Sequence, residues 1–328
     1  MKHFKPIVRG FVPFLFLCSL AITGHAQTTK TLRVAHDFWV GYAGFFVAVE
    51  KGYFKEVGLN IVDKTFPMPG DGTVPLLQGQ VDIHLSTIDT FLVAEDRSPN
   101  SIRLLALVDS SNGADAVIAK KSIPDLAALK GKQVGVALGQ TSHFLLLKGL
   151  AAKNVSPADL KLIDLNGDAA GNAFAAGKLD AAVTWEPFVT QGLSKGGHVL
   201  YSTADAPDQI INAIGVTPAT LKNNRGALIA FLKAYKRGTD WALQNKAGAA
   251  AIVGKTLQQK PSDVAEMMAK DKLYTLADSR ALIGTRDKPG KVLQTTEEIS
   301  AFLLANKIVG KKVDAARLFD GSLLQEIK

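Results

Sequence analysis

From Thr31 onward, short runs of β-branched and aliphatic residues alternate with longer amphipathic runs, and this alternation restricts the fold more than any other feature. Strands separated by helical runs of this length predict βαβ units and parallel sheets. The apolar run Ile102–Val108 is typical of a strand buried on both faces. The runs that we expect to be strands are Leu32–Ala35, Asn60–Phe66, Asp82–Ser86, Ile102–Val108, Val134–Leu138, Leu162–Leu165 and Ala181–Trp185.

The last third of the chain has a different pattern. From about Leu221 it is predicted to be nearly all helical, and four large apolar residues recur at i, i+3, i+4 and i+7, namely Leu228, Phe231, Leu232 and Tyr235. We expect this block to have no strand of its own, so it must pack on a sheet that is built earlier. The N-terminal sheet is the nearest candidate.

These patterns predict two α/β lobes. Residues 27–117 begin lobe I, residues 118–212 form lobe II, and residues 213–328 return to lobe I. The expected crossings between the lobes are Asp115–Lys121 and Ile210–Thr217. Two crossings between two lobes make a hinge around a cleft.

Residues 1–26 have the pattern of a cleavable signal peptide. Lys2, Lys5 and Arg9 precede the apolar stretch Phe11–Ile22, and small residues follow near Ala26. A stretch of about 12 residues is too short to cross a hydrocarbon core of about 30 Å, so we predict secretion. An uncleaved anchor is the alternative.

Composition excludes several classes of protein. Three of the 38 Lys and Arg residues and none of the 30 Asp and Glu residues lie in the predicted leader, so the net charge of +8 falls to +5. That charge is too dilute for nucleic-acid binding, which we do not expect. The only cysteine, Cys18, also lies in the leader, so the mature chain offers no disulfide, thiolate metal site or cysteine nucleophile. We expect neither a metal nor a cofactor.

The candidate ligand-binding residues follow the predicted strands. In open parallel sheets, ligands bind beyond the carboxyl ends of the strands. The polar and aromatic residues at these positions are Asp37, Trp39, Tyr42, Thr87, Asp89, Ser111, Asn112, Asp115, Thr141, Ser142, His143, Trp185 and Glu186. The alternatives are helix caps for the Thr, Ser and Asp residues, a local turn for residues 109–115, and a core role for Trp39.

Several ordered motifs resemble one known family. Trp39-x-Gly41-Tyr42 precedes Phe46-x-Ala48-x-Glu50-Lys51-Gly52-Tyr53-Phe54, and further motifs follow at residues 78–82, 111–115, 129–136 and 180–187. This order is similar to that of the nitrate, sulfonate, taurine and thiamine-precursor binding proteins of ATP-binding-cassette (ABC) importers. The resemblance implies a type II periplasmic binding protein fold, with parallel-rich sheets joined by a two-segment hinge. It also implies a periplasmic monomer that clamps a small molecule and docks on permease and ATPase subunits.

The charges around the expected cleft suggest the class of ligand. The rim carries six carboxylates and two histidines, with no Lys or Arg: Asp37, Asp89, Asp109, Asp115, Asp168, Glu186, His36 and His143. A bare anion would be repelled there, whereas an amine or amidine-like end would be attracted, with Trp39 and Trp185 available for cation–π contact. We expect any oxyanion end to bind at the helix start Thr141–His143, and taurine fits both halves.

An enzyme and a ligand-binding sensor are the two alternatives to a transport receptor. An enzyme is disfavoured because the Gly-x-Ser-x-Gly, His-Glu-x-x-His, Walker A and Gly-x-Gly-x-x-Gly motifs are absent from the sequence. The related thiamine-pyrimidine synthases carry a cysteine-rich motif, which the mature chain lacks. A ligand-binding sensor for a signalling receptor remains an open alternative to transport.

Overall fold

The strands form two separate sheets. The computed structural model describes residues 1–3, 29–285 and 287–327, so nearly all of the predicted signal peptide lies outside the described residues. The first sheet has the order β11-β4-β10-β3-β1-β2 and the second has the order β7-β6-β8-β5-β9. The strands of the first sheet are β1 (Lys30–His36), β2 (Leu59–Thr65), β3 (Ile83–Thr87), β4 (Arg103–Ser111), β10 (Ile211–Val216) and β11 (Asp271–Leu273). The strands of the second are β5 (Asp115–Lys120), β6 (Gln133–Val136), β7 (Lys161–Asp164), β8 (Ala181–Trp185) and β9 (Gly197–Ser202).

The sheets are mixed rather than parallel-rich, and this corrects one part of the predicted fold class. Strands β1, β2 and β3 are parallel, as are β6, β7 and β8. Strand β10 runs antiparallel to both β3 and β4, and β5 runs antiparallel to both β8 and β9. Each of these two strands is the first after a passage between the sheets, so it enters its sheet in the direction opposite to that of its neighbours.

The chain passes between the sheets at residues 112–114 and again at residues 203–210. Both passages come before the predicted crossings, because Asp115–Lys120 and Ile211–Val216 are strands inside the sheets. The boundaries drawn after residues 117 and 212 therefore fall within β5 and β10. The division into lobes remains a proposal, and below lobe I and lobe II denote the parts of the chain around the first and second sheets.

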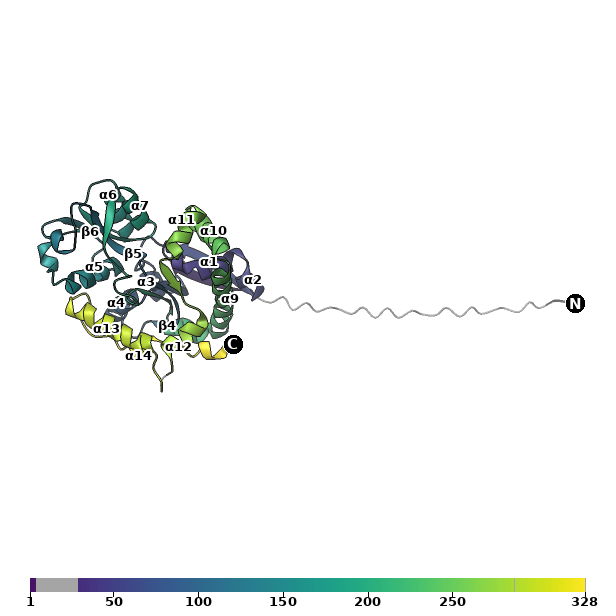
Figure 1. Cartoon of the computed structure of the whole chain (residues 1–328). Helices are drawn as coiled ribbons and strands as arrows, with labels where there is room; N and C mark the ends of the chain where they lie inside the picture. Colours follow the sequence, from purple (N-terminus) through teal and green to yellow (C-terminus); the bar gives the residue numbers. More distant parts are fainter. Residues whose placement is uncertain (4–28, 286, 328) are drawn as a thin grey trace.

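Helices flank both sheets (Figure 1). They are α1 (Ala43–Glu50), α2 (Tyr53–Glu56), α3 (Thr73–Leu77), α4 (Ile88–Arg97), α5 (Thr141–Ala152), α6 (Gly167–Ala175), α7 (Phe188–Ser194), α8 (Pro218–Asn223), α9 (Arg225–Gln244), α10 (Lys246–Leu257), α11 (Pro261–Met268), α12 (Leu276–Ile283), α13 (Lys291–Ala305) and α14 (Ala315–Leu318). None of the helices in the described ranges is long and apolar enough to cross a membrane.

The strands of the second sheet contain few polar residues because apolar side chains pack on both of its faces. Side chains alternate between the two faces of a strand, so neighbours in sequence contact different helices. Ala116 and Ile118 of β5 belong to a cluster with Phe174 of α6, whereas Val117 and Phe144 of α5 belong to the main core. The sheet is therefore covered on both faces, which accounts for the short, uninterrupted apolar runs of the sequence.

The predicted apolar face of α9 is confirmed. Leu228, Phe231, Leu232 and Tyr235 are all buried, and the Phe231 ring stacks on Phe54 with a centroid distance of 5.0 Å. Helix α9 also packs closely on α1. A Cβ atom on Gly238 would lie 2.0 Å from the carbonyl oxygen of Gly44, so only glycine permits this approach.

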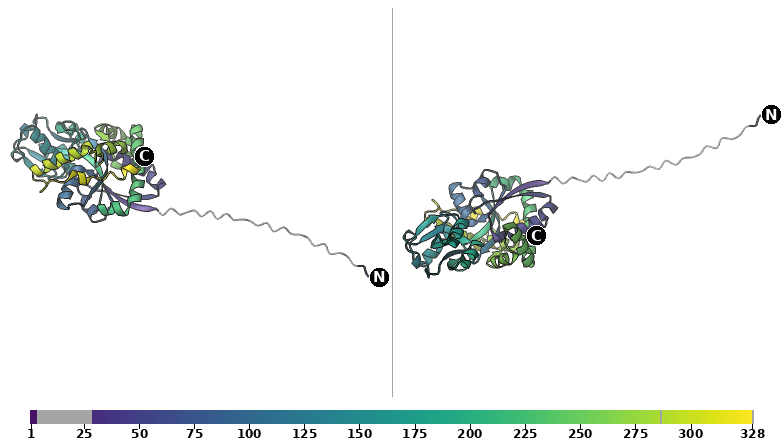
Figure 2. Two further views of the ribbon diagram at one scale, coloured as in Figure 1. Left: turned by 90° about the horizontal axis from the view of Figure 1, so that it is seen from below. Right: turned by 90° about the horizontal axis from the view of Figure 1, so that it is seen from above.

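The C-terminal block differs from its prediction in two ways. It does contribute a strand, because β11 pairs with the outer side of β4. It also contacts both lobes, since Phe302 of α13 packs edge-on against Phe144 of α5 at 5.5 Å. The Lys148 ammonium group lies 5.0 Å from the centre of the Phe302 ring. Figures 1 and 2 show α13 extending from α14 to the neighbourhood of α5.

Candidate functional site

A small cavity of about 20 Å³ lies between the two sheets. Its lining residues are Asp37, Trp39, Pro69, Thr87, Asp115, Thr141, Trp185, Ile210 and Asn212. A space of this size holds about one water molecule or one ammonium group. Six of the predicted binding residues line it: Asp37, Trp39, Thr87, Asp115, Thr141 and Trp185.

Strand ends bring these side chains together. Asp37 and Trp39 follow β1, and Thr87 ends β3 beside it in the same sheet. In the second sheet, Asp115 opens β5 directly opposite Trp185, the last residue of β8. The strand ends of the two sheets therefore meet at this cavity.

Hydrogen bonds across the cavity hold the lobes in a closed arrangement. The Thr87 and Thr141 hydroxyl oxygens are 2.9 Å apart, and the Thr141 hydroxyl donates to Asp89 Oδ2 at 2.9 Å. Thr87 and Asp89 belong to lobe I, whereas Thr141 begins α5 of lobe II. The other carboxylate oxygen of Asp89 is buried and has no hydrogen-bond partner.

A buried network fixes the lobe I side of the cavity. Asp109 accepts hydrogen bonds from Trp39 Nε1 at 3.0 Å and from Asn212 Nδ2 at 2.8 Å. The Tyr42 hydroxyl lies 2.8 Å from Asp37 Oδ1 and 3.0 Å from Asn212 Oδ1. Tyr42 does not line the cavity, so its part is to position Asp37.

Burial dominates the electrostatics of this region. Desolvation raises the pKa of Asp37 and of Asp89 to about 6, and it raises the pKa of Asp109 and of Asp115 to about 7. It also raises the pKa of Asp271 well above its usual value. These groups repel one another, and no Lys or Arg lines the cavity. A cation placed there would relieve both the desolvation and the repulsion.

Asp115 is the cavity-lining carboxylate that has an unpartnered oxygen. Its Oδ2 is buried and has no hydrogen-bond partner. Its backbone N–H donates to the Ser111 hydroxyl at 3.2 Å, and the Ser111 hydroxyl lies 2.8 Å from that of Thr203. Ser111 therefore ties together the two passages between the sheets. Asn112, predicted to bind ligand, is exposed and does not line the cavity.

The helix start predicted to hold an oxyanion is arranged differently from the expectation. The Ser142 hydroxyl accepts from the Ala137 backbone N–H at 3.3 Å, and His143 Nδ1 accepts from the Gly139 N–H at 3.2 Å. Both side chains therefore serve the loop before α5, and neither lines the cavity. Only Thr141 of this trio does, and its hydroxyl is engaged by Asp89.

Glu186 corrects the prediction that the cleft carboxylates have no basic partner. This residue is fully buried and accepts from the Lys270 ammonium group at 2.5 Å, and from the Thr190 N–H and hydroxyl at 3.0 Å each. Lys270 lies between α11 and β11 of lobe I, so the ion pair joins the two lobes. Lys270 lies 84 residues after Glu186 in the sequence, and no local pattern indicated that the two residues would pair.

Sequence reasoning also missed three lining residues, Pro69, Ile210 and Asn212. Asn212 offered one signal, because it is the polar residue in the apolar strand β10 and is buried. Pro69 and Ile210 lie in connecting segments and carry no chemical signature. They reach the cavity only through the packing of the two lobes.

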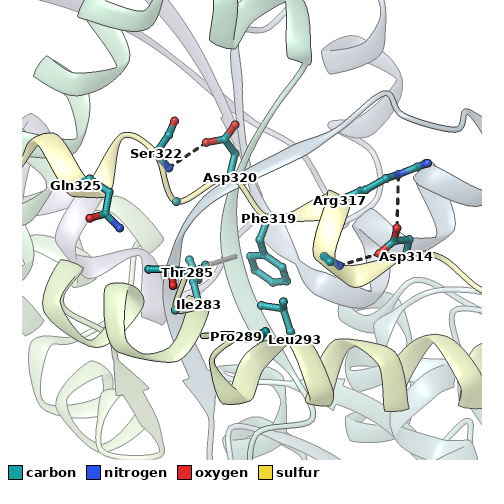
Figure 3. Close-up of a pocket in the computed structure, with 13 residues that line it drawn as sticks. Ile283, Thr285, Pro289, Leu293, Asp314, Arg317, Phe319, Asp320, Ser322 and Gln325 are labelled. Carbon is teal, nitrogen blue, oxygen red and sulfur yellow. Dashed lines mark hydrogen bonds and ion pairs between the residues drawn. The ribbon is translucent and has the colours of Figure 1, made fainter. Parts of the chain in front are cut away.

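A second cavity of about 780 Å³ lies near the C-terminus (Figure 3). Phe319, Leu293 and Pro289 point toward one another, while Asp314 and Arg317 pair at the rim and Asp320 accepts from the Ser322 N–H. None of the described residues that line this cavity has a buried side-chain polar atom without a hydrogen-bond partner. The inter-lobe cavity, with its unpartnered carboxylate oxygen, is the stronger candidate for a ligand site.

Comparison with known proteins supports the fold. A family model described as NMT1/THI5 like matches residues 39–249. The taurine-binding periplasmic protein of Escherichia coli is 28% identical over 149 residues, which cover 45% of this chain and 46% of that protein. The formylaminopyrimidine-binding protein of Halalkalibacterium halodurans is 25% identical over 255 residues, covering 75% and 76%. A putative binding protein of Brucella abortus is 27% identical over 177 residues, covering 53% and 52%. The chain therefore spans about half the length of the first curated relatives that it matches.

Solved structures share the architecture. The alkanesulfonate-binding protein of Xanthomonas axonopodis pv. citri, bound to MOPS, has a TM-score of 0.75 at 16% identity, covering 89% of this chain and 98% of that one. The periplasmic nitrate-binding protein of Synechocystis has a TM-score of 0.73 at 15% identity, covering 91% and 88%. At these identities the likeness confirms the periplasmic binding protein fold.

Proposed function

The chain belongs to the NMT1/THI5-like family, and on this premise we propose that it is the solute-binding receptor of an ABC importer. Its ligand is a small molecule with an amine-bearing or amidine-like end. The protein closes its two lobes around that end, and the closed form docks on a permease. A sensor that reports the ligand to a signalling receptor is the alternative.

One observation carries the proposal. Asp37 and Asp115, from different lobes, line one closed cavity together with Trp39 and Trp185, and no Lys or Arg lines it. An ammonium group fits the volume, attracts both carboxylates, and can stack against an indole ring. An isolated oxyanion in the same place would meet only like charges.

The ligands in the names of the relatives indicate which classes of small molecule to consider. Their names include taurine, aliphatic sulfonates and a formylaminopyrimidine. Taurine and aminopyrimidines carry an amine nitrogen, whereas nitrate and simple sulfonates do not. The oxyanion half of a taurine-like ligand has less support, because Ser142 and His143 are engaged locally and Thr141 donates to Asp89.

Ligand would select the closed form through contacts with both lobes. A ligand shifts an equilibrium between two states only by its difference in affinity for them. Asp37 and Trp39 supply contacts from lobe I, and Asp115 and Trp185 supply contacts from lobe II. Removal of either set is expected to lower affinity and to weaken closure.

The remaining parts of the proposal rest on the sequence and the relatives. We place the mature protein in the periplasm after cleavage of residues 1–26, with a permease and an ATPase as partners and the monomer as the working form. We propose no catalytic activity, since the relatives are named as binding proteins and the mature chain has no cysteine.

A thermal-shift panel tests the ligand class. Protein refolded free of bound solute is heated with nitrate, bicarbonate and methanesulfonate, and separately with taurine, 2-aminoethylphosphonate and a 4-aminopyrimidine. A ligand at a hundred times its Kd stabilises by about 2.7 kcal/mol, which raises Tm by several degrees. We expect shifts only with amine-bearing ligands, and smaller shifts with Asp115→Asn. A shift with the simple anions alone would refute the acidic site.

A further inference from the structure

A larger cavity of about 690 Å³ adjoins the inner cavity described above. Trp185 lines both cavities, so this indole lies between the two spaces. Residues of both lobes form the outer cavity, and those of lobe I include residues of the helices α10 and α11. Its apolar lining includes Phe38, Pro67, Trp185, Phe188, Leu257 and Met267.

Phe38 marks the mouth of this outer cavity. It directly follows Asp37 of the inner cavity, yet its side chain is 47% exposed. An exposed aromatic residue that lines a cavity together with Phe188 and Met267 of other elements is typical of a surface that a ligand covers.

Two residues that line the outer cavity carry buried polar atoms without hydrogen-bond partners. Trp185 is 4% exposed, and its Nε1 donor has no hydrogen-bond partner. Asp168 Oδ1, from the outer cavity, is also buried without a partner. Buried polar groups of folded proteins are normally satisfied, so both atoms are available to a bound molecule.

We propose that the ligand is an arylalkyl or alkyl amine whose ammonium group enters the inner cavity and whose apolar body fills the outer one. This inference rests on the proposed function, because it takes the amine-binding site as given. The inner cavity has room for little more than an ammonium group, so the rest of any ligand must extend past Trp185.

The charged residues that line the outer cavity indicate that the body of the amine ligand is neutral. It is lined by Asp168 and Asp263 and by no Lys or Arg. A ligand with an anionic end, such as the sulfonate of taurine, would therefore place that end close to Asp168 and Asp263 and be repelled by them. A neutral aromatic or alkyl body meets apolar side chains instead, and only a hydroxyl or N–H group carried on that body could donate a hydrogen bond to Asp168.

The test compares three probes on the full mature protein, two of which share the same shape and differ in charge. Ethylammonium carries the charged end alone, 2-phenylethylammonium adds the apolar body, and 3-phenylpropionate has the body with the opposite charge. Isothermal titration calorimetry is expected to show 2-phenylethylammonium binding at least tenfold more tightly than ethylammonium, and no binding of 3-phenylpropionate.

Variants then locate the added affinity. Phe38→Ala changes an exposed side chain and should fold normally; it is expected to weaken 2-phenylethylammonium at least threefold and to leave ethylammonium unchanged. Phe188→Ala should act in the same way. Val74→Ala is the control, because Val74 is 58% exposed and does not line either cavity.

The outcomes separate the two proposals. Equal affinities for the two ammonium probes, or an aromatic gain that Phe38→Ala and Phe188→Ala both leave intact, would overturn the outer subsite and leave the amine site standing. Binding of 3-phenylpropionate as tightly as 2-phenylethylammonium would overturn the amine site. Failure of both ammonium probes to bind would overturn both proposals.

Discussion

Acidification is expected to weaken the binding of an amine ligand to this protein. The pKa of Asp115 is about 7 and that of Asp37 about 6 in the ligand-free protein, because burial disfavours the charged forms. The groups that face Asp115 are also acidic: Asp37, Asp89 and Asp109 raise its pKa, and Asp271 is repelled by it. An ammonium ligand binds the ionised carboxylates, so it must displace any proton that they hold.

The size of the effect follows from these two values. If both carboxylates must be ionised, the competent fraction falls from about nine-tenths at pH 8 to about one-twentieth at pH 6, so affinity falls about twentyfold. Calorimetry at both pH values, in two buffers with different ionisation enthalpies, measures the affinity and the protons released. At pH 6 we expect release of more than one proton per ligand.

The ligand-free protein should respond in the opposite direction. A carboxyl group whose pKa is raised on folding stabilises the folded state most below its unfolded pKa of about 4, and that contribution is lost as pH rises through the folded pKa. For Asp115 the loss between pH 5.5 and pH 8 is about 2 kcal/mol. Tm without ligand should therefore rise on acidification over this range, while affinity falls.

Asp115→Asn is the decisive variant for this reasoning. It removes one titrating group, keeps the shape of the side chain, and should flatten both pH profiles. An amine affinity that changes less than twofold between pH 8 and pH 6 in the unmodified protein would refute the reasoning. So would a pH profile that is identical in the variant.

Two further predictions concern packing and closure. Lys270→Ala leaves the buried carboxylate of Glu186 without its charged partner. We expect the free energy of unfolding, measured with urea, to fall by about 1–3 kcal/mol and ligand binding to weaken. Unchanged values of both would show that the ion pair is dispensable. Gly238→Ala places a methyl group 2.0 Å from the Gly44 carbonyl and should cost about 2 kcal/mol or more, whereas Gly226→Ala in the same helix meets no atom within 4 Å and should be neutral or slightly stabilising. Equal Tm values for the two alanine variants would contradict the close approach of α1 and α9.

The parts of the site that follow strands could be predicted from sequence. Asp37, Thr87 and Trp185 each lie where an apolar run ends, and the rule that ligands gather at strand ends applies to any sheet of this kind. The helical periodicity of α9 was equally readable, because its buried face recurs every three to four residues.

The rest of the site depends on how the lobes meet. Thr141 lines the cavity while its neighbours Ser142 and His143 turn back to their own loop, and side-chain type alone does not separate these fates. Lys270 and Asn212 both follow the second passage between the sheets in the sequence, far from the residues that they contact. Their roles are set by tertiary packing, which local patterns do not encode.

The strand order of the first sheet has a consequence for how the protein assembles during synthesis. Strand β10 lies between β3 and β4, yet the chain makes it only after all five strands of the second sheet. The second sheet is continuous in sequence and can form as soon as it has been synthesised. The first must wait with its central position open, and contacts across so much intervening chain form slowly. The sheet that begins first in the sequence is therefore completed last, and the edge that lines the inter-lobe cavity, which includes Asn212, is completed with it.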